Sequence, residues 1–312
     1  MSIFKLHGKK IWVAGHNGMV GKAVVRLLEI KNCEILTSDR LSLDLTNQQD
    51  VNNWVARHKP DVVIICAAKV GGILANNSYP AEFLYQNLMI EANIIHAAYE
   101  CEVDKLLFLG SSCIYPKHAE QPMKETALLT GPLENTNEWY ALAKIAGIKL
   151  CQAYRTQFGT DFISAMPTNL YGPHDNFDLL SSHVLPALIR KTHEAKLNNQ
   201  NEIKVWGTGE PLREFMHVDD CAEGIIFLLE NYSDLSHVNI GTGEEISIRE
   251  LSEMIKSTVG FNGSTEFDNS KPDGTPRKLL DTSKINNLGW YPKINMDSGL
   301  SDTYEWFLEN YQ

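Results

Sequence analysis

The sequence predicts an α/β fold in which a doubly wound parallel sheet is joined to a smaller mixed α/β lobe near the C-terminus. Short apolar runs alternate with helix-length segments through the first half of the chain, an order typical of βαβ units. A glycine-rich turn follows the first apolar run and leads directly into a helix-length segment. The chain has 312 residues, which is more than one small core uses, so we expect two lobes.

The elements of the first half follow from hydrophobic periodicity. Strands are expected where short runs of branched apolar residues occur, at 11–13, 34–37, 62–66, 105–109 and 161–166. Helices are expected between these runs, at 21–31, 49–58, 87–100 and 139–158. Parallel strands joined in this way have right-handed crossovers.

After residue 173 the alternation loosens, and we expect a smaller mixed lobe. Helices are predicted at 183–196, before 230, at 248–257 and at 299–311, with short strands at 203–206 and 237–240. The run at 237–240 is apolar enough to return to the main sheet. We therefore expect one domain from residues 1–172 plus about 215–240, and a second from 173–214 plus 241–312.

Composition excludes several classes of protein. The formal net charge of −11 argues against a nucleic-acid or anionic-membrane partner. No apolar run approaches the roughly 18 residues that span a bilayer. The first residues carry no signal-peptide pattern, and the six cysteines form no CxxC pair or Cys/His cluster. We expect free thiols, no metal site and a cytoplasmic protein.

The glycine-rich turn is Gly15-His16-Asn17-Gly18-Met19-Val20-Gly21. Glycines in this spacing allow a tight turn and close approach of a pyrophosphate, and the following helix N-terminus favours anions. A simple turn is the alternative. The strand before it and the helix after it favour a dinucleotide site in a sheet of the Rossmann type.

The end of the second predicted strand should meet the adenosine ribose. The sequence there is Thr37-Ser38-Asp39-Arg40. An acid would bind the 2′-hydroxyl of NAD, whereas Arg40 would pair with the 2′-phosphate of NADP. Both are present, so the local pattern is divided, and Arg40 could also belong to a solvated turn.

A tyrosine and a lysine four residues apart form the candidate catalytic pair. Tyr140 and Lys144 share one face of a predicted helix, and an adjacent ammonium favours the phenolate. Ser111 lies where the 105–109 strand ends, the edge at which chemistry gathers in open α/β sheets. A serine there can hydrogen-bond a substrate carbonyl. Cys113 follows it, although a lone buried cysteine is more often a small hydrophobe.

Longer strings carry a resemblance over essentially the whole chain. They are AAKVGGI at 67–73, MPTNLYGPHDN at 166–176 and KPDGTPRK at 271–278. With the glycine loop, the 110–116 segment and the Tyr140/Lys144 pair, they make the chain similar to the extended short-chain dehydrogenase/reductase family. Within it, the strings resemble enzymes that convert GDP-4-keto-6-deoxy-D-mannose to GDP-L-fucose by 3,5-epimerisation and NADPH-dependent 4-keto reduction.

The resemblance assigns roles to residues. It implies that Cys113 is the base and His183 the acid of epimerisation, and that Ser111, Tyr140 and Lys144 serve the 4-keto group. It implies a GDP-sugar site in the second domain, a cofactor site in the first and a homodimer packed through the helix that carries Tyr140. The residues implied to contact NADP(H) are Gly15 to Gly21, Arg40, Leu109, Gly110, Ser111, Ser112, Tyr140, Lys144, Pro167, Thr168, Asn169, Leu170 and His183. Those implied to contact the GDP-sugar are Lys191, Trp206, Arg213 and Asp273.

Alternatives remain open at this point. Some relatives carry an arginine at the position of Asn17, and that arginine binds the 2′-phosphate. With Asn17 there instead, the expected preference for NADP over NAD is smaller. Trp206 is equally an ordinary core residue. Another nucleotide-sugar 4-epimerase or a 4,6-dehydratase is the nearest rival activity, although dehydratases use an acidic pair where this chain has Ser112 and Cys113. A dinucleotide-sensing regulator without activity is a more remote alternative.

Overall fold

The computed structural model describes residues 2–179, 181–271 and 273–311. Six parallel strands form its main sheet, in the order β2-β1-β3-β4-β5-β10. They are β1 (Lys10–Ala14), β2 (Glu34–Leu36), β3 (Val62–Ile65), β4 (Lys105–Leu109), β5 (Phe162–Pro167) and β10 (Val238–Ile240). The predicted doubly wound parallel sheet is confirmed, and the 237–240 run is the returning strand.

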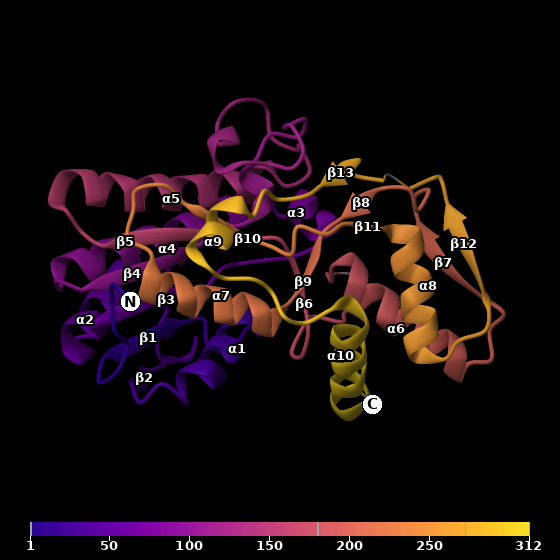
Figure 1. The fold of residues 1–312 in the computed structure, drawn as a ribbon, viewed down its shortest axis with the longest axis horizontal. Helices are drawn as coiled ribbons and strands as arrows, with labels where there is room; N and C mark the ends of the chain where they lie inside the picture. Colours follow the sequence, from indigo (N-terminus) through magenta and orange to yellow (C-terminus); the bar gives the residue numbers. More distant parts are fainter. Residues whose placement is uncertain (1, 180, 272, 312) are drawn as a thin grey trace.

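Helices cover both faces of the sheet (Figure 1). One face packs against α1 (Met19–Leu28) and α7 (Val218–Asn231), and the other against α2 (Gln48–His58), α4 (Pro80–Glu100) and α5 (Glu138–Phe158). Strand side chains alternate between the two layers: Val13 joins the first core cluster and Trp12 the second. Strands β3 and β4 are buried along their whole length, which is why they read as unbroken apolar runs.

Local signals set several helix ends. The Asn47 side chain caps α2 by accepting the Gln49 N–H at 3.0 Å. Helix α5 ends at Gly159, which has φ 73°. Helix α4 begins at Pro80 rather than at the predicted residue 87, because proline fits the first helical turn, where no intrahelical N–H bond is needed.

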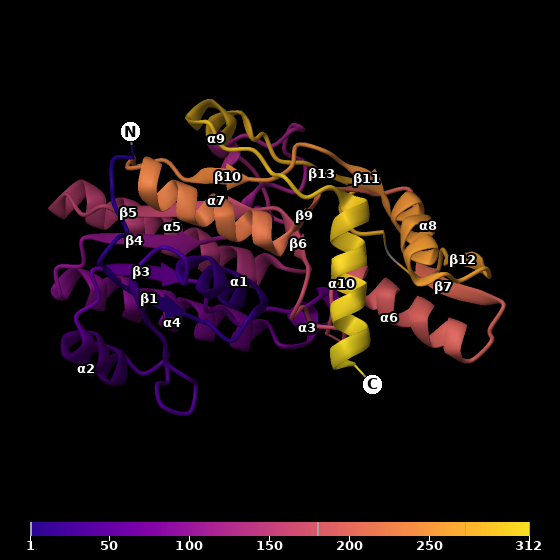
Figure 2. The ribbon, with the colours of Figure 1, turned by 60° about the horizontal axis from the view of Figure 1, so that its bottom comes forward.

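The second lobe has its own core, built from three helices and short strands at the other end of the long axis (Figure 1, Figure 2). The helices are α6 (Val184–Leu197), α8 (Ile248–Val259) and α10 (Met296–Asn310). Strand β7 (Glu202–Trp206) pairs with β12 (Ser264–Asp268), and β8 (Leu212–Arg213) lies between β11 (Ile246–Ser247) and β13 (Arg277–Lys278). The remaining elements are α3 (Ile73–Ser78), η1 (Ser112–Ile114), η2 (Glu125–Ala127), β6 (Asn169–Tyr171), β9 (Phe215–His217) and α9 (Ser283–Leu288).

The carboxyl ends of the parallel strands lie at one edge of the sheet. Strand order reverses around β1, since β2 and β3 lie on opposite sides of it. At this point the backbones approach closely: a Cβ on Gly15 would lie 2.5 Å from the Ala67 backbone nitrogen. Ligands bind at such switch points in open α/β sheets, so the edge beyond β1, β3 and β4 is where a site should form. Among the described helices, none combines the length and apolar character needed to cross a membrane.

Candidate active site

The glycine loop has the geometry of a phosphate cradle. Gly15 has φ 91°, which favours glycine, and a Cβ on Gly21 would lie 2.1 Å from the Gly15 carbonyl oxygen. Gly18 precedes α1, and no side chain caps the helix there. The N-terminal N–H groups of α1 therefore face the loop as donors for an anion. Of the seven predicted residues, Gly15 to Gly18 form the turn between β1 and α1, and Met19 to Gly21 form the first turn of α1. The N–H donors of this arrangement suit a pyrophosphate.

Asp39 and Arg40, which the sequence left divided between NAD and NADP, lie at the end of the loop where the ribose is expected. The Asn17 side-chain amide donates to Asp39 Oδ1 at 2.8 Å, and His16 Nε2 lies 3.5 Å from the same oxygen. Arg40 is exposed beside it. The loop thus holds Asp39 on the protein's own donors and leaves the Arg40 guanidinium accessible. This arrangement favours a phosphate over a bare hydroxyl at the ribose.

Tyr140 and Lys144 lie side by side on α5. Lys144 is 3% exposed, its ammonium donates to the Leu109 carbonyl at 2.9 Å, and it lies 5.8 Å from the Tyr140 ring centroid. Burial lowers the pKa of Lys144, while Glu91 and Cys113 oppose that change. Burial raises the pKa of Tyr140 well above 10, and Cys113 and Glu91 add to the rise. Tyr140 therefore starts as a protonated phenol, the form that can donate.

The segment after β4 brings a serine and a thiol to the same place. Ser111 begins η1, and its hydroxyl oxygen accepts the Cys113 N–H at 3.5 Å. Helix α5 packs against η1. Burial raises the pKa of the Cys113 thiol, whereas Lys278, Ser111 and Lys144 favour its thiolate. Two cations acting on one buried thiol are the surroundings in which a cysteine can exchange a proton.

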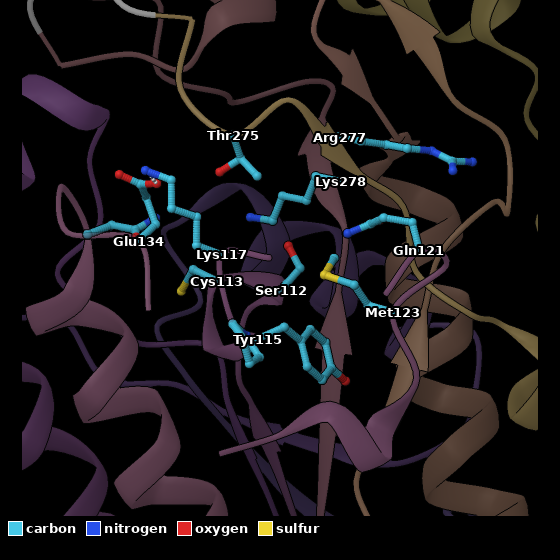
Figure 3. A pocket seen from close by; sticks show the side chains of 12 residues that line it. Ser112, Cys113, Tyr115, Lys117, Gln121, Met123, Glu134, Thr275, Arg277 and Lys278 are labelled. Atoms are coloured by element: carbon cyan, nitrogen blue, oxygen red, sulfur yellow. Dashed lines mark ion pairs between the residues drawn. The ribbon is translucent and has the colours of Figure 1, made fainter. Parts of the chain in front are cut away.

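Residues of both lobes line a pocket at Cys113. Ser112 and Cys113 line it from the sheet lobe, and Thr275, Arg277 and Lys278 line it from the second lobe (Figure 3). Lys278 extends from β13 into this pocket (Figure 3), and burial lowers its pKa. Its ammonium acts electrostatically on Cys113 and on His183. The Lys278 charge thus favours the thiolate of Cys113 and the neutral form of His183.

His183 is the N-cap residue of α6. The helix begins at Val184, one residue later than predicted. Its side chain is open to solvent, although protein atoms crowd it on most sides, and that crowding and then Lys278 lower its pKa. The loop after β3 fixes the chain just before it: the Gly72 N–H donates to the Ser181 carbonyl at 2.9 Å. A Cβ on Gly72 would lie 2.7 Å from the Ser182 carbonyl oxygen.

The four residues predicted to contact a nucleotide sugar gather in the second lobe. Trp206 is 55% exposed, so the reading of it as a core residue is wrong. The Lys191 and Lys271 ammonium groups lie 5.5 Å and 5.6 Å from its ring centroid. Asp273 accepts from the backbone N–H and hydroxyl of Thr208 at 2.7 Å and 2.9 Å, and Arg213 donates to the Asp273 carbonyl at 3.4 Å. An aromatic surface among cations suits a nucleotide diphosphate.

The segment after β5 serves to join the lobes. The Thr168 hydroxyl and the Asn169 amide both donate to the Glu214 carbonyl, at 3.3 Å and 2.7 Å. Pro167 ends β5, and Leu170 lies in β6 beside β9. The Thr168 and Asn169 side chains are thus engaged with the protein itself.

Comparison with known proteins places the chain in a family. A model of the NAD dependent epimerase/dehydratase family matches residues 11–241. The chain belongs to this family. It is 58% identical over 310 residues to a GDP-L-fucose synthase of Sinorhizobium fredii, covering 99% of each chain. It is 61% identical over 302 residues to GDP-L-fucose synthase 1 of Arabidopsis thaliana, covering 96% of this chain and 94% of that one.

A solved structure agrees in fold over the same length. The GDP-L-fucose synthetase of Naegleria fowleri bound to NADP superposes with a TM-score of 0.91 at 30% identity, covering 99% of this chain and 97% of that one. The Rossmann-like sheet with flanking helices, predicted from the sequence, is therefore shared with an enzyme of the same family.

Three residues of the site were missed by the sequence reasoning. Lys278 lies in a quoted string but was not singled out, because nothing in the pattern shows which lysine faces a pocket. Gly72 belongs to another such string. Glu91 had a detectable signal, since it is a charged residue on the buried side of α4. Within the described residues, no group of three or more His, Cys, Asp and Glu side chains could hold a metal ion.

Proposed function

We propose that the chain converts GDP-4-keto-6-deoxy-D-mannose to GDP-L-fucose by 3,5-epimerisation followed by NADPH-dependent reduction of the 4-keto group. The observation that carries this proposal is geometric: Cys113 from the sheet lobe and Lys278 from the second lobe line one pocket. A reductase needs only the Ser111, Tyr140 and Lys144 set, whereas epimerisation needs a further base and acid. The names of the relatives support the same product.

Residues 1–172 plus about 215–240 are proposed to bind the cofactor, and 173–214 plus 241–312 the GDP-sugar. Residues Gly15 to Gly21 would hold the pyrophosphate and Arg40 the 2′-phosphate of NADP(H). The remaining contacts would come from Leu109 to Ser112, Tyr140, Lys144, the backbone of Pro167 to Leu170, and His183. When bound, NADPH supplies the hydride for C4. The exposed Arg40 is the reason to expect NADPH to bind more tightly than NADH.

Epimerisation depends on the acidity that the 4-keto group confers on the C3 and C5 protons. Cys113 removes one of these protons as a thiolate, which Lys278 and Lys144 stabilise. The hydroxyl groups of Ser111 and Tyr140 hold the negative oxygen at C4. His183 returns a proton from the opposite face. Thiol and imidazole suit this exchange because both can release and take up a proton, and the Lys278 and Lys144 charges offset part of the burial that raises the pKa of Cys113.

The reductive step needs a proton for the C4 oxygen. Tyr140 donates it, since burial keeps its phenol protonated. Lys144 stays close to Tyr140 because its ammonium is held on the Leu109 carbonyl. The Lys144 charge stabilises the phenolate that remains after donation. Tyr140 and Lys144 therefore serve the last step and polarise the carbonyl in the earlier ones.

The nucleotide part of the substrate is proposed to lie along the second lobe. Trp206 offers its exposed ring to the ligand, with Lys191 beside it. Arg213 is positioned by Asp273 and can pair with the diphosphate in bidentate fashion. The register places Arg213 opposite Lys278, so the diphosphate site adjoins the pocket at Cys113. The sugar can then reach Cys113 while its phosphates contact Arg213.

The assembly and location follow as further proposals. We infer a homodimer through α5, because Trp139 and Leu142 on that helix are 41% and 38% exposed and large apolar side chains at a surface mark interfaces. All six cysteines are free, which suits a reducing cytoplasm.

Product analysis tests the proposed function. The purified protein is incubated with GDP-4-keto-6-deoxy-D-mannose and NADPH, and the product is identified by NMR. We expect GDP-L-fucose with one NADPH consumed for each product. A product reduced at C4 without inversion at C3 and C5 would contradict the epimerase part. Tightly retained NAD in the purified protein would instead indicate a 4-epimerase.

A further inference from the structure

An unpaired carboxyl lies buried behind the catalytic helix. Glu91, on α4, is 2% exposed, and neither oxygen of its carboxyl has a hydrogen-bond partner among the described residues. Unpaired buried acids are rare because leaving water costs free energy that a partner normally offsets. Neither the fold nor the steps proposed above give Glu91 a role.

The packing between α4 and α5 places this carboxyl beside Lys144. A Cβ on Gly147 would lie 3.0 Å from the Glu91 carboxyl carbon and 2.4 Å from the Phe108 ring. The Lys144 ammonium lies 4.6 Å from the centroid of that same ring. Lys144 and Gly147 are three residues apart on α5 and share a face. The missing side chain at Gly147 therefore leaves room for the Glu91 carboxyl against the face of α5 that carries Lys144.

We propose that Glu91 is a positioning residue that acts through Lys144: the charge of its carboxyl sets the strength of Tyr140 as the proton donor for reduction at C4. This inference rests on the reductive step proposed above. It assigns Glu91 no contact with the substrate, and it leaves the Cys113 and His183 chemistry unchanged.

The groups that interact with this cluster come from three directions. Helix α5 presents Tyr140, Lys144 and Cys151, and the segments after β3 and β4 present Cys66 and Cys113. Burial raises the pKa of Cys66 and of Cys151 to about 12, so both remain thiols. Burial raises the pKa of Glu91 to about 8, although the Lys144 ammonium opposes the rise. Glu91 is thus the buried acid of this set that changes charge near the working pH.

The sign of the effect follows from these charges. Below about pH 8 Glu91 is neutral, so no carboxylate there opposes release of the Tyr140 proton. Above that pH the carboxylate raises the pKa of both Tyr140 and Lys144. Tyr140 then becomes a weaker acid. The reductive step should slow above about pH 8, while proton exchange at C3 and C5, in which Tyr140 only shares the C4 oxygen with Ser111, should respond less to Glu91.

The test compares wild type with Glu91→Gln, which keeps the shape of the side chain and removes its charge. NADPH oxidation in single turnover is followed from pH 6.5 to 9.5, and deuterium exchange at C3 and C5 is measured in parallel. In wild type the reduction rate should fall about threefold to tenfold across pH 8. In Glu91→Gln that fall should move up by about one pH unit or more. Exchange should differ less between the two proteins than reduction does.

A matched control is Glu125→Gln. Glu125 is half-buried and accepts the Asn239 N–H at 3.0 Å, and burial raises its pKa too, but Lys144 and Tyr140 are not among the groups that interact with it. This variant should keep the wild-type profile. Superimposable profiles for wild type and Glu91→Gln would overturn the inference, because a residue that only fills space would give that result. Wild type without any NADPH oxidation would instead contradict the proposed function.

Thermal unfolding without cofactor gives a readout that does not depend on activity. The unfolded chain releases the Glu91 proton above about pH 4.5, whereas the folded protein holds it until about pH 8. Ionisation therefore opposes folding as pH rises through this window. The Tm of wild type should fall relative to Glu91→Gln between pH 5 and pH 8.5. Parallel curves would contradict the inference, and Glu91→Leu replaces Glu91→Gln in both assays if the latter fails to fold.

Discussion

Replacing Gly72 with alanine tests how the loop after β3 positions the proposed acid, His183. The backbone at Gly72 has φ −65° and ψ 179°, which alanine adopts without strain. The new Cβ would lie 2.7 Å from the Ser182 carbonyl oxygen, roughly 0.5 to 1 Å inside normal contact. The segment before His183 must move away by about that distance. This movement would also strain the 2.9 Å hydrogen bond from the Gly72 N–H to the Ser181 carbonyl.

A displacement of 1 Å at a reacting group can cost on the order of 100-fold in rate, so we expect Gly72→Ala to lose about tenfold to 100-fold in inversion at C3 and C5. The assay is NMR of the sugar product over time, with NADPH affinity measured alongside. NADPH affinity should stay within about twofold of wild type. Gly71→Ala is the matched control, because its Cβ would meet only the side chains of Ala75 and Phe83, at 3.0 Å and 3.3 Å. Wild-type inversion rates in Gly72→Ala would refute the reasoning.

Other predictions concern the cofactor cradle and the core. Gly18→Ala should keep the wild-type Tm, since its Cβ would lie 3.6 Å from the nearest atom, but it should weaken NADPH binding. In Gly21→Ala the Cβ would lie 2.1 Å from the Gly15 carbonyl oxygen, so both the Tm and the affinity for NADPH should fall. A wild-type Tm in Gly21→Ala would contradict the loop geometry. Arg40→Ala should weaken NADPH binding about fivefold to tenfold and leave NADH binding unchanged, as measured by fluorescence titration; equal losses for both would argue against the 2′-phosphate contact. Burial lowers the pKa of His237 from 6.5 to about 4, so the unfolded chain takes up its proton first and stability should fall by about 3 kcal/mol between pH 6.5 and pH 4. In denaturant unfolding, the free energy of unfolding of His237→Asn should fall much less over this pH range. The same dependence on pH as in wild type would contradict the prediction.

Much of the sheet lobe could be predicted because its signals are local and strong. Apolar runs such as Val62–Ile65 have few alternatives to a buried strand. The glycine loop predicts a turn between strand and helix. A side chain at Gly15 would be strained by its positive φ, and a Cβ at Gly21 would clash with the Gly15 carbonyl oxygen. The strands of the second lobe were harder: β8, β11 and β13 have two residues each. Their pairing depends on tertiary contacts and leaves no periodic pattern in the sequence.

The site divides in the same way. Tyr140 and Lys144 are four residues apart on one helix, so their proximity follows from helix geometry. Cys113, His183 and Lys278 come from η1, from the start of α6 and from β13. Only the fold brings Cys113 and Lys278 to one pocket, and the resemblance named Cys113 and His183 but not Lys278. Glu91 depends on the absence of a side chain at Gly147 across a helix interface, which a single sequence does not show.

Deuterium exchange tests the central claim, that Cys113 starts epimerisation and Tyr140 serves the reduction that follows. The protein is incubated with GDP-4-keto-6-deoxy-D-mannose in deuterated water, with and without NADPH, and isotope content at C3 and C5 is read by NMR. Wild type should take up deuterium at both carbons before any reduction. Cys113→Ala should lose this exchange, and Tyr140→Phe should keep the exchange but lose reduction. Normal exchange in Cys113→Ala would contradict the account.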